Sequence, residues 1–270
     1  MKTRILAAAA LLPLLLLVVL AAPKIFTAIL FGAIGAIGAY ELLSGTGIIK
    51  AKQLVAYSAV MAFIVALYSY FLWNIIWIQL AVLVFWILLF AEMMLSQLKL
   101  PFDKVIVCFA AGVIIPYFLT ALVRIHGNEY GRFLILIPFV LAFLSDTGGY
   151  FAGRILGKHK LAPVISPKKT VEGVIGGVFG AILGMILYCL ILQSFFDFSV
   201  NYFYALVYGI LGSLGAVFGD LCFSVIKRQT GIKDYGNLIP GHGGILDRFD
   251  SMIVVAPIVE LLLILLPLVV

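Results

Sequence analysis

Charged residues are scarce in this sequence, and their scarcity excludes an ordinary soluble fold. Asp, Glu, Lys and Arg make up 11% of the 270 residues, whereas hydrophobic residues make up 64%. Soluble domains have roughly 25% charged and 45–50% apolar residues. Because so few polar residues cannot cover a core of this size, the natural solvent of the chain is a lipid bilayer.

Cysteine is also rare, and its placement excludes a thiolate metal site. Cys108, Cys189 and Cys222 all lie in apolar segments without a C-x-x-C spacing, so we expect reduced, buried thiols. The net charge of +6 is typical of a membrane protein with basic cytoplasmic loops. We therefore expect no nucleic-acid partner.

Long apolar runs predict an all-α, polytopic integral membrane protein with about nine transmembrane helices. A spanning helix needs about 20 apolar residues, and runs of this kind are bounded by charges, prolines or glycines. The expected spans are 5–22, 25–43, 53–71, 75–95, 103–123, 132–151, 172–193, 202–223 and 250–269. The first run has a basic start and precedes Pro23, so a cleaved signal peptide is a competing interpretation. We favour a first span, because eight further spans follow.

The distribution of basic residues predicts the orientation. With the N-terminus inside, all but Lys24, Arg124 and Arg132 of the 18 Lys and Arg residues face the cytoplasm. This predicts a multi-pass protein of the cell (inner) membrane, with cytoplasmic connections 152–171 and 224–249. These two connections are long and polar, so we expect a cytoplasmic active site there.

The chain divides by composition into two regions. Residues 1–130 are expected to form a membrane-spanning region for packing and dimer contacts, in which Ala28, Gly32 and Ala36 let helices approach closely. Residues 131–270 are expected to form the catalytic membrane region.

Carboxylates inside spans are costly, so each one is a candidate for function. Asp146 and Asp220 fall near the cytoplasmic ends of the sixth and eighth spans. For Glu41 and Glu92, also near cytoplasmic ends, we favour a structural role in which the side chain snorkels to water. Glu260 lies deeper in the last span, and the sequence assigns it no role.

Asp220, Ser224 and Lys227 follow an i, i+4, i+7 spacing, which places them on one face of a continuous helix. A carboxylate, a hydroxyl and an ammonium would then point the same way. The alternative is an Asp–Lys pair that only neutralises a helix end, and the spacing alone favours neither.

The following stretch favours phosphate chemistry. It contains Lys227-Arg228, Lys233-Asp234 and then Pro240-Gly241-His242-Gly243-Gly244-Ile245-Leu246-Asp247-Arg248-Phe249-Asp250. Glycines let a backbone approach a ligand, and backbone N–H groups at a helix start favour anions. Asp247 and Asp250, at i and i+3, offer oxygen ligands for a hard cation. Carboxylates, basic side chains and glycines together suit Mg²⁺-bound polyphosphate. His242 could be a general base, a structural hydrogen-bond donor or a residue that hydrogen-bonds a phosphate.

The earlier connection has a similar composition. It contains Gly153-Arg154, Gly157-Lys158 and Ser166-Pro167-Lys168-Lys169-Thr170-Val171-Glu172-Gly173. We predict a phosphate-contacting loop, because Ser166-Pro167 favours a β-turn, two lysines follow it, and Glu172 lies in the first helical turn of the next span. The alternative is that the lysines are there only because cytoplasmic loops are rich in basic residues. Further on, G-x-x-x-G spacings at Gly176, Gly180 and Gly184, and at Gly215 and Gly219, predict that the seventh and eighth spans pack tightly.

These residues resemble a known family. Ser224-Val225-Ile226-Lys227-Arg228, Lys233-Asp234 and the run from Pro240 to Asp250 look like the signature of the phosphatidate cytidylyltransferases, or CDP-diacylglycerol synthases. Ser145-Asp146-Thr147, Gly153-Arg154 and Ser166 to Gly173 are also similar to that family. The resemblance covers about 145–250 and none of the N-terminal half.

The resemblance implies an activity and its components. It implies transfer of CMP from CTP to phosphatidate in phospholipid biosynthesis, giving CDP-diacylglycerol and pyrophosphate. It also implies Mg²⁺, K⁺ as a candidate second cation, membrane lipid as surroundings and a homodimer.

We assign residue roles on this basis. The assigned catalytic residues are Asp220, Lys227, Arg228, Asp247 and Arg248; the metal ligands are Asp220 and Asp247, with Asp250 and Asp146 as further candidates. The assigned substrate-binding residues are Ser145, Asp146, Arg154, Ser166, Lys168, Lys169, Thr170, Glu172, Ser224, Lys233, His242, Gly243 and Gly244.

Three other classes compete. A cation-coupled transporter would use charged residues in spans, but here the acids cluster at one face and no inverted repeat is visible. A CTP-dependent lipid kinase would use similar chemistry and release CDP in place of pyrophosphate. A CDP-alcohol phosphotransferase is disfavoured because its D-x-x-D-G…D-x-x-x-D spacing is missing.

Overall fold

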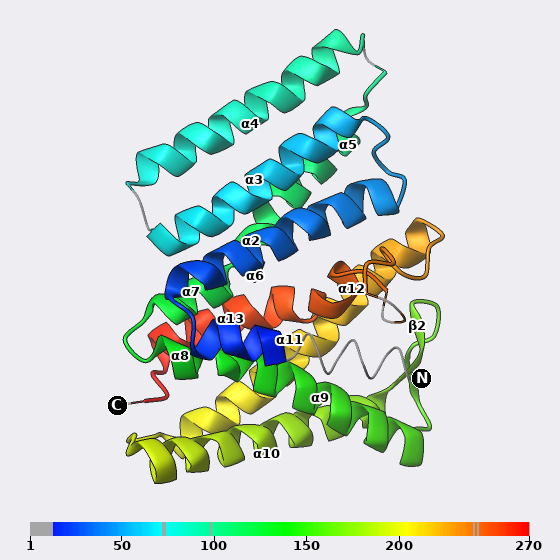
Figure 1. Cartoon of the computed structure of the whole chain (residues 1–270). Coiled ribbons are helices and arrows are strands. Elements are labelled where there is room, and N and C mark those ends of the chain that lie inside the picture. The colour runs from blue at the N-terminus through cyan, green and yellow to red at the C-terminus, as the bar shows by residue number, and fades with distance from the viewer. Residues whose placement is uncertain (1–12, 72–73, 98, 240, 242, 270) are drawn as a thin grey trace. The chain divides into compact units, whose positions relative to one another are not determined.

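The structure is a computed structural model that describes residues 13–71, 74–97, 99–239, 241 and 243–269 (Figure 1). The predicted first span, 5–22, lies partly outside the described residues; within them, residues 13–20 are helical. His242 lies outside them as well.

The described chain is a set of long apolar helices, which confirms the prediction of an all-α polytopic membrane protein. Seven helical segments are long and apolar enough to cross a bilayer: Lys24–Gly45, Lys52–Phe71, Ile75–Leu95, Phe102–Gly127, Gly131–Ile155, Val171–Phe196 and Tyr202–Gln229. The predicted count of nine is not confirmed. The predicted last span, 250–269, contains the helix α13 (Met252–Leu265), whose 14 residues are fewer than a perpendicular crossing needs.

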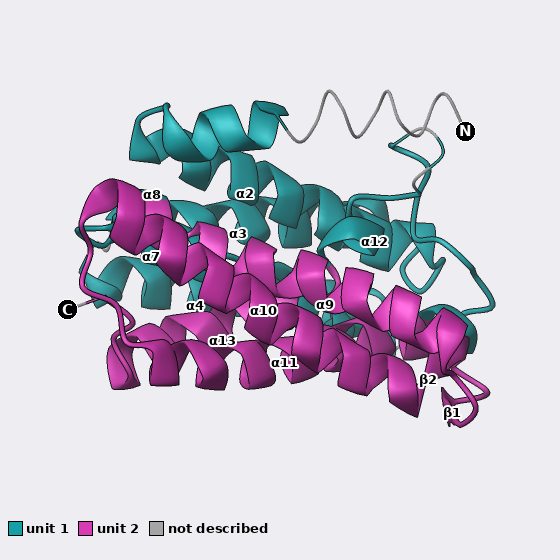
Figure 2. Cartoon of the chain, turned by 90° about the horizontal axis from the view of Figure 1, so that it is seen from below, with its two compact units in different colours: residues 1–132, 227–249 teal, residues 133–226, 250–270 magenta. Residues whose placement is uncertain are grey.

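The chain forms two compact units, coloured separately in Figure 2. Unit 1 comprises Met1–Arg132 and Lys227–Phe249, and unit 2 comprises Phe133–Ile226 and Asp250–Val270. The second polar connection thus groups with the N-terminal helices, and the first groups with the helices that flank it.

Unit 1 is built on helices that pack through small residues. Its elements are α2 (Lys24–Tyr40), η1 (Glu41–Gly45), α3 (Lys52–Phe71), α4 (Ile75–Leu95), α5 (Phe102–Phe109), η2 (Ala110–Ile114), α6 (Ile115–Leu119), α7 (Ala121–Gly127) and α12 (Leu246–Phe249); α8 (Gly131–Leu134) lies at the boundary. A Cβ on Gly32 of α2 would lie 2.9 Å from the Phe63 ring and 3.1 Å from the Ala66 methyl of α3. Helix packing therefore accounts for a small residue at this position.

Unit 2 consists of long helices and a short β-hairpin. Its elements are α9 (Leu136–Ile155), β1 (Lys160–Ala162), β2 (Ser166–Thr170), α10 (Val171–Phe196), most of α11 (Tyr202–Gln229) and α13. The antiparallel hairpin pairs Lys160 with Thr170 and Ala162 with Ser166. It occupies the connection 152–171, which the sequence analysis treated as a loop.

The glycines of α10 pack against a different helix from the one predicted. A Cβ on Gly180 would lie 2.6 Å from the Leu144 carbonyl oxygen of α9, and a Cβ on Gly148 of α9 would lie 2.5 Å from the Gly176 carbonyl oxygen. Gly215 of α11 instead faces Ile258 of α13. The seventh and eighth spans do approach each other closely, since a Cβ on Gly209 of α11 would lie 2.7 Å from the Ile182 Cα atom of α10. The predicted G-x-x-x-G series do not form this contact, because a spacing identifies a small-residue face but not the helix that covers it.

Candidate active site

The helix that carries three of the predicted site residues is continuous. Asp220, Ser224 and Lys227 all lie in α11, as the i, i+4, i+7 spacing requires. Asp220 pairs with Lys169, and Lys227 pairs with Asp247. Each acid or base is therefore matched with a residue from another segment.

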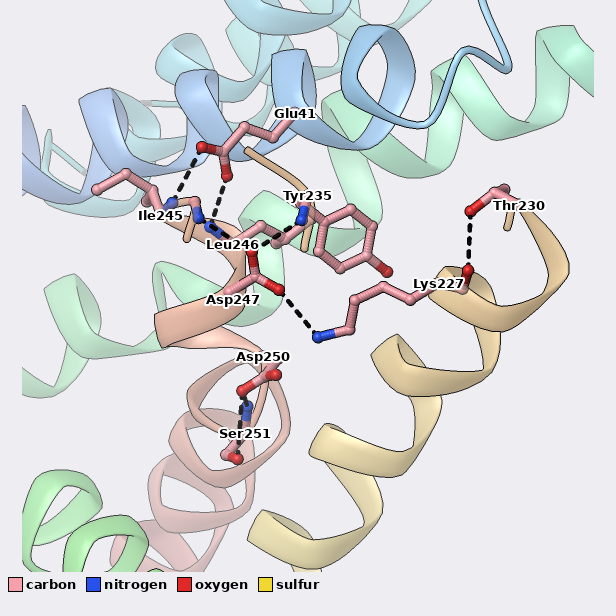
Figure 3. A network of polar contacts seen from close by, with 10 residues as sticks. Glu41, Lys227, Thr230, Tyr235, Ile245, Leu246, Asp247, Asp250 and Ser251 are labelled. Atoms are coloured by element: carbon pink, nitrogen blue, oxygen red, sulfur yellow. Dashed lines mark hydrogen bonds and ion pairs between the residues drawn. The ribbon is translucent and has the colours of Figure 1, made fainter. Parts of the chain in front are cut away.

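In unit 1, Asp247 lies at the centre of a buried network (Figure 3). Its Oδ1 atom accepts a hydrogen bond from Lys227 Nζ at 2.9 Å, and its Oδ2 atom accepts from the backbone N–H groups of Tyr235 at 2.8 Å and Gly244 at 3.0 Å. The Asp247 and Lys227 side chains are only 2% and 10% exposed. Lys227 Nζ also lies 5.3 Å from the centre of the Tyr235 ring, so the ammonium has both a carboxylate and an aromatic face as partners.

Glu41, at the start of η1, belongs to the same network. Its two carboxylate oxygens accept from the backbone N–H groups of Ile245 at 3.0 Å and Leu246 at 2.8 Å. The residue is 3% exposed. The prediction that Glu41 snorkels to water is therefore wrong. Glu41 and Tyr235 are members of the network that were not predicted as site residues. The only signal of Glu41 in the sequence was a carboxylate inside a span.

We name these residues, Glu41, Lys227, Tyr235, Gly244 and Asp247, the Asp247 cluster. The loop that supplies part of it is shaped by glycines. Gly241 and Gly243 have φ values of +77° and +85°, a conformation that suits glycine. The Ile239 N–H donates to the Gly243 carbonyl oxygen at 3.0 Å, which holds these two residues together.

The expected single helix start at Asp247 and Asp250 is interrupted. Helix α12 ends at Phe249, and α13 begins at Met252. Asp250 lies between them, in unit 2, where its Oδ1 atom accepts from the Ser251 N–H at 2.7 Å. The i, i+3 spacing therefore does not place the two acids on one continuous helix.

In unit 2, Asp220 forms an ion pair with Lys169 of β2. Asp220 Oδ2 lies 2.5 Å from Lys169 Nζ, and the two side chains are 28% and 24% exposed. Lys169 Nζ also donates to the Val217 carbonyl oxygen at 3.4 Å, one turn before Asp220 on α11. We name Lys169 and Asp220 the Asp220 pair.

Two predicted substrate-binding residues hold the hairpin to α10. Thr170 is the N-cap of α10, where its Oγ1 atom accepts from the Gly173 N–H at 3.1 Å. Glu172 accepts from the backbone N–H groups of Lys158 and His159 and lies 2.6 Å from His159 Nδ1. Both side chains therefore tie the hairpin, which carries Lys168 and Lys169, to the start of α10.

The other predicted residues lie in several environments. Ser145 is buried and hydrogen-bonds Ser213 of α11 at 2.7 Å, and Ser224 is buried in α11. Arg154 donates to the Tyr150 hydroxyl at 2.8 Å. Ser166 and Gly243 are half-buried, whereas the exposed residues are Asp146, Arg154, Lys168, Arg228, Lys233 and Arg248.

The carboxylates suit a metal that is shared with a substrate better than a metal held by the protein alone. Within the described residues, no group of three or more His, Cys, Asp or Glu side chains could hold an ion. In unit 1, Asp247 already accepts three hydrogen bonds. In unit 2, Asp220 has one ion pair and is partly exposed. Mg²⁺ commonly binds one or two carboxylates together with substrate phosphates, and a single carboxylate such as Asp220 fits that pattern.

Taken together, the helices define a multi-pass membrane protein in which buried or half-buried carboxylates are matched with lysines. The chain belongs to the cytidylyltransferase family, whose model matches residues 2–266.

Similar proteins are known in staphylococci. A protein of Staphylococcus saprophyticus named phosphatidate cytidylyltransferase is 45% identical over 141 residues, which is 52% of this chain and 51% of that protein. Proteins of the same name from Staphylococcus haemolyticus and Staphylococcus aureus strain COL are 46% identical over 134 residues and 44% identical over 146 residues. The matched part of the chain spans about half the length of each of these relatives.

Proposed function

We propose that this protein transfers CMP from CTP to phosphatidate. A phosphatidate oxygen attacks the α-phosphorus of CTP, the bond from that phosphorus to the bridging oxygen breaks, and CDP-diacylglycerol and pyrophosphate are formed. The observation that carries this proposal is membership of the cytidylyltransferase family, with relatives named phosphatidate cytidylyltransferase.

Charge is the main obstacle to this reaction. A phosphate monoester has a second pKa of about 6 and is already largely ionised near neutral pH, so no strong general base is needed. The obstacle is repulsion between an anionic nucleophile and an anionic triphosphate, which positioned cations lower. Lys227, Arg228 and Arg248 offset phosphate charge, and Lys168 and Lys169 hold one of the phosphates.

The remaining polar residues position these groups. Ser224 and His242 orient phosphate oxygens, as do the backbone N–H groups near Gly243. Ser145, Arg154, Lys233 and the hairpin residues complete the substrate contacts. The buried ion pair of Lys227 with Asp247 at 2.9 Å supports this scheme, because it places an ammonium in the signature segment at low solvent exposure.

Mg²⁺ is the proposed cofactor, with Asp220 and Asp247 as ligands and Asp146 and Asp250 as further candidates. When bound, the ion would withdraw charge from the phosphate oxygens. K⁺ is proposed as a second cation, and a homodimer as the assembly. We also propose that the site faces the cytoplasm, where CTP is found.

The test is pyrophosphate release by the purified protein in detergent, with CTP, Mg²⁺ and phosphatidate each omitted in turn. Release that needs all three, together with a CMP-bearing lipid product, is the expected result. The Asp220→Asn variant should lose activity and remain folded, whereas Asp103→Asn, an exposed acid at the start of α5, should behave as wild type. Release of CDP would indicate a lipid kinase, and no turnover by folded protein would refute the proposal.

A further inference from the structure

Glu41 stands apart from every residue assigned so far, because it comes from the N-terminal helices and contacts the signature segment. It lies in the segment Lys24–Gly45, which is long and apolar enough to span a membrane. Its carboxylate nevertheless bonds Ile245 and Leu246, more than 200 residues further along the chain. A carboxylate buried in an apolar region is costly unless its oxygens are satisfied, and here two backbone N–H groups satisfy them.

Glycines make this contact possible. A Cβ on Gly236 would lie 2.5 Å from Glu41 Oε1, and a Cβ on Gly244 would lie 2.5 Å from Glu41 Oε2. Neither oxygen could move away easily, because each is bonded to a backbone N–H. Gly236 and Gly244 therefore leave room for the Glu41 carboxylate. This contact explains why glycine occupies the two positions without any appeal to a bound ligand.

The contact controls the segment that presents Asp247. The N–H groups of the successive residues Gly244, Ile245 and Leu246 all donate to carboxylates, the first to Asp247 and the other two to Glu41. Asp247 then follows directly in α12. Because Glu41 fixes the two peptide groups just before Asp247, it limits where the Asp247 backbone can lie.

The local helix geometry supports the same conclusion. Glu41 begins the π-helical segment η1, Glu41–Gly45, which directly continues α2. An i to i+5 turn changes the direction in which side chains leave a helix, and such turns are frequent at functional sites. A Cβ on Gly38 of α2 would lie 3.5 Å from Leu246 Cδ1, so α2 packs against the same end of α12 that the Glu41 carboxylate binds.

We propose that Glu41 is a positioning residue. By binding the backbone of Ile245 and Leu246, it holds Asp247 in the geometry needed for nucleotidyl transfer. This inference rests on the proposed function. Glu41 touches neither substrate in this proposal and acts through the backbone of Ile245 and Leu246. A misplacement of about 1 Å at a reacting centre can reduce the rate about 100-fold, so loosening this segment should affect turnover more than binding.

The first experiment compares Glu41→Gln with a matched control. Glutamine keeps the size of the side chain but turns one acceptor into an NH₂ group that would face a backbone N–H. Glu92→Gln is the control, because Glu92 also lies in a long apolar helix but its carboxylate, among the described residues, accepts only from the Tyr57 hydroxyl, at 3.4 Å. We expect kcat of Glu41→Gln to fall by about 10-fold to 100-fold, with KM for phosphatidate unchanged and Glu92→Gln within about twofold of wild type.

A second variant guards against simple misfolding. Gly236→Ala keeps the Glu41 charge and displaces its carboxylate, so it should reproduce the loss of kcat. Gly127→Ala is the control, because a Cβ there would meet no atom of the described residues within 4 Å. All rates are normalised to the monodisperse protein recovered from size exclusion. Wild-type kcat in folded Glu41→Gln, or in Gly236→Ala if Glu41→Gln does not fold, would overturn the proposal.

Amide hydrogen exchange separates this proposal from the proposed function. The N–H groups of Ile245 and Leu246 should exchange faster in Glu41→Gln than in wild type, with no change in Glu92→Gln. If wild-type protein releases no pyrophosphate, the proposed function fails, whereas faster exchange would still establish that Glu41 holds the segment. Unchanged exchange at both amides would overturn the positioning role, whatever the activity.

Discussion

Lys227 and Asp247, 20 residues apart in the sequence, form an ion pair of 2.9 Å whose side chains are 10% and 2% exposed. Removing one member of a buried pair leaves an uncompensated charge, whereas removing both is often tolerated. The pair therefore links the end of α11 to the start of α12. A substitution of either residue alone should lower the stability of the protein.

We expect Asp247→Asn and Lys227→Met each to destabilise the protein by about 3–5 kcal/mol. The double variant should be more stable than the sum of the two effects predicts, because no charge is left unpaired. Thermal unfolding of all four proteins in one detergent measures this coupling. Strictly additive shifts in melting temperature would show that the two residues do not interact.

The Asp220 pair should behave differently, because it is partly exposed. Such pairs contribute about 1 kcal/mol or less to stability, which corresponds to roughly 4 °C or less in melting temperature. We therefore expect Asp220→Asn and Lys169→Gln to melt close to wild type but to lose most pyrophosphate release. Lys52→Gln, an exposed lysine at the start of α3, is the control. Full activity in both variants would contradict a role in phosphate chemistry.

Close packing of α9 against α10 gives a prediction on folding alone. In Gly148→Ala the added methyl would lie 2.5 Å from the Gly176 carbonyl oxygen, a backbone atom that cannot swing aside. We expect a loss of about 1–3 kcal/mol, measured as a lower melting temperature. Gly127→Ala should show no such loss, and equal melting of the two variants would argue against this helix contact.

The proposed orientation can be tested by cysteine labelling in whole cells. The three native cysteines are first replaced, and a single cysteine is placed at Lys158 or at Glu129, both of which are exposed. A membrane-impermeant maleimide should label Glu129→Cys in intact cells and Lys158→Cys only after permeabilisation. The reverse pattern would invert the topology.

Much of this molecule could be predicted from one-dimensional patterns. The apolar runs gave most of the spans, because a helix that crosses a bilayer must be long and apolar along its whole length. The i, i+4, i+7 spacing placed Asp220, Ser224 and Lys227 on one helix, because helical periodicity is a local property.

The interruption between α12 and α13 could not be predicted in the same way. Asp247 and Asp250 have the spacing of one helix face, yet the helix breaks between them. The sequence also did not show that the G-x-x-x-G glycines of α10 pack against α9. A face of small residues can pack against any neighbouring helix, so the spacing alone does not identify the partner.

By itself, the sequence determined that the chain is a membrane protein with its acids and bases concentrated in two connections, because composition and charge need no partner to be read. Only the tertiary structure decided which charges meet: Lys169 with Asp220, and Lys227 with Asp247. It also decided that Glu41 joins the segment that carries Asp247. Contacts between residues far apart in the chain depend on how the helices pack, and no local pattern in the sequence encodes that packing.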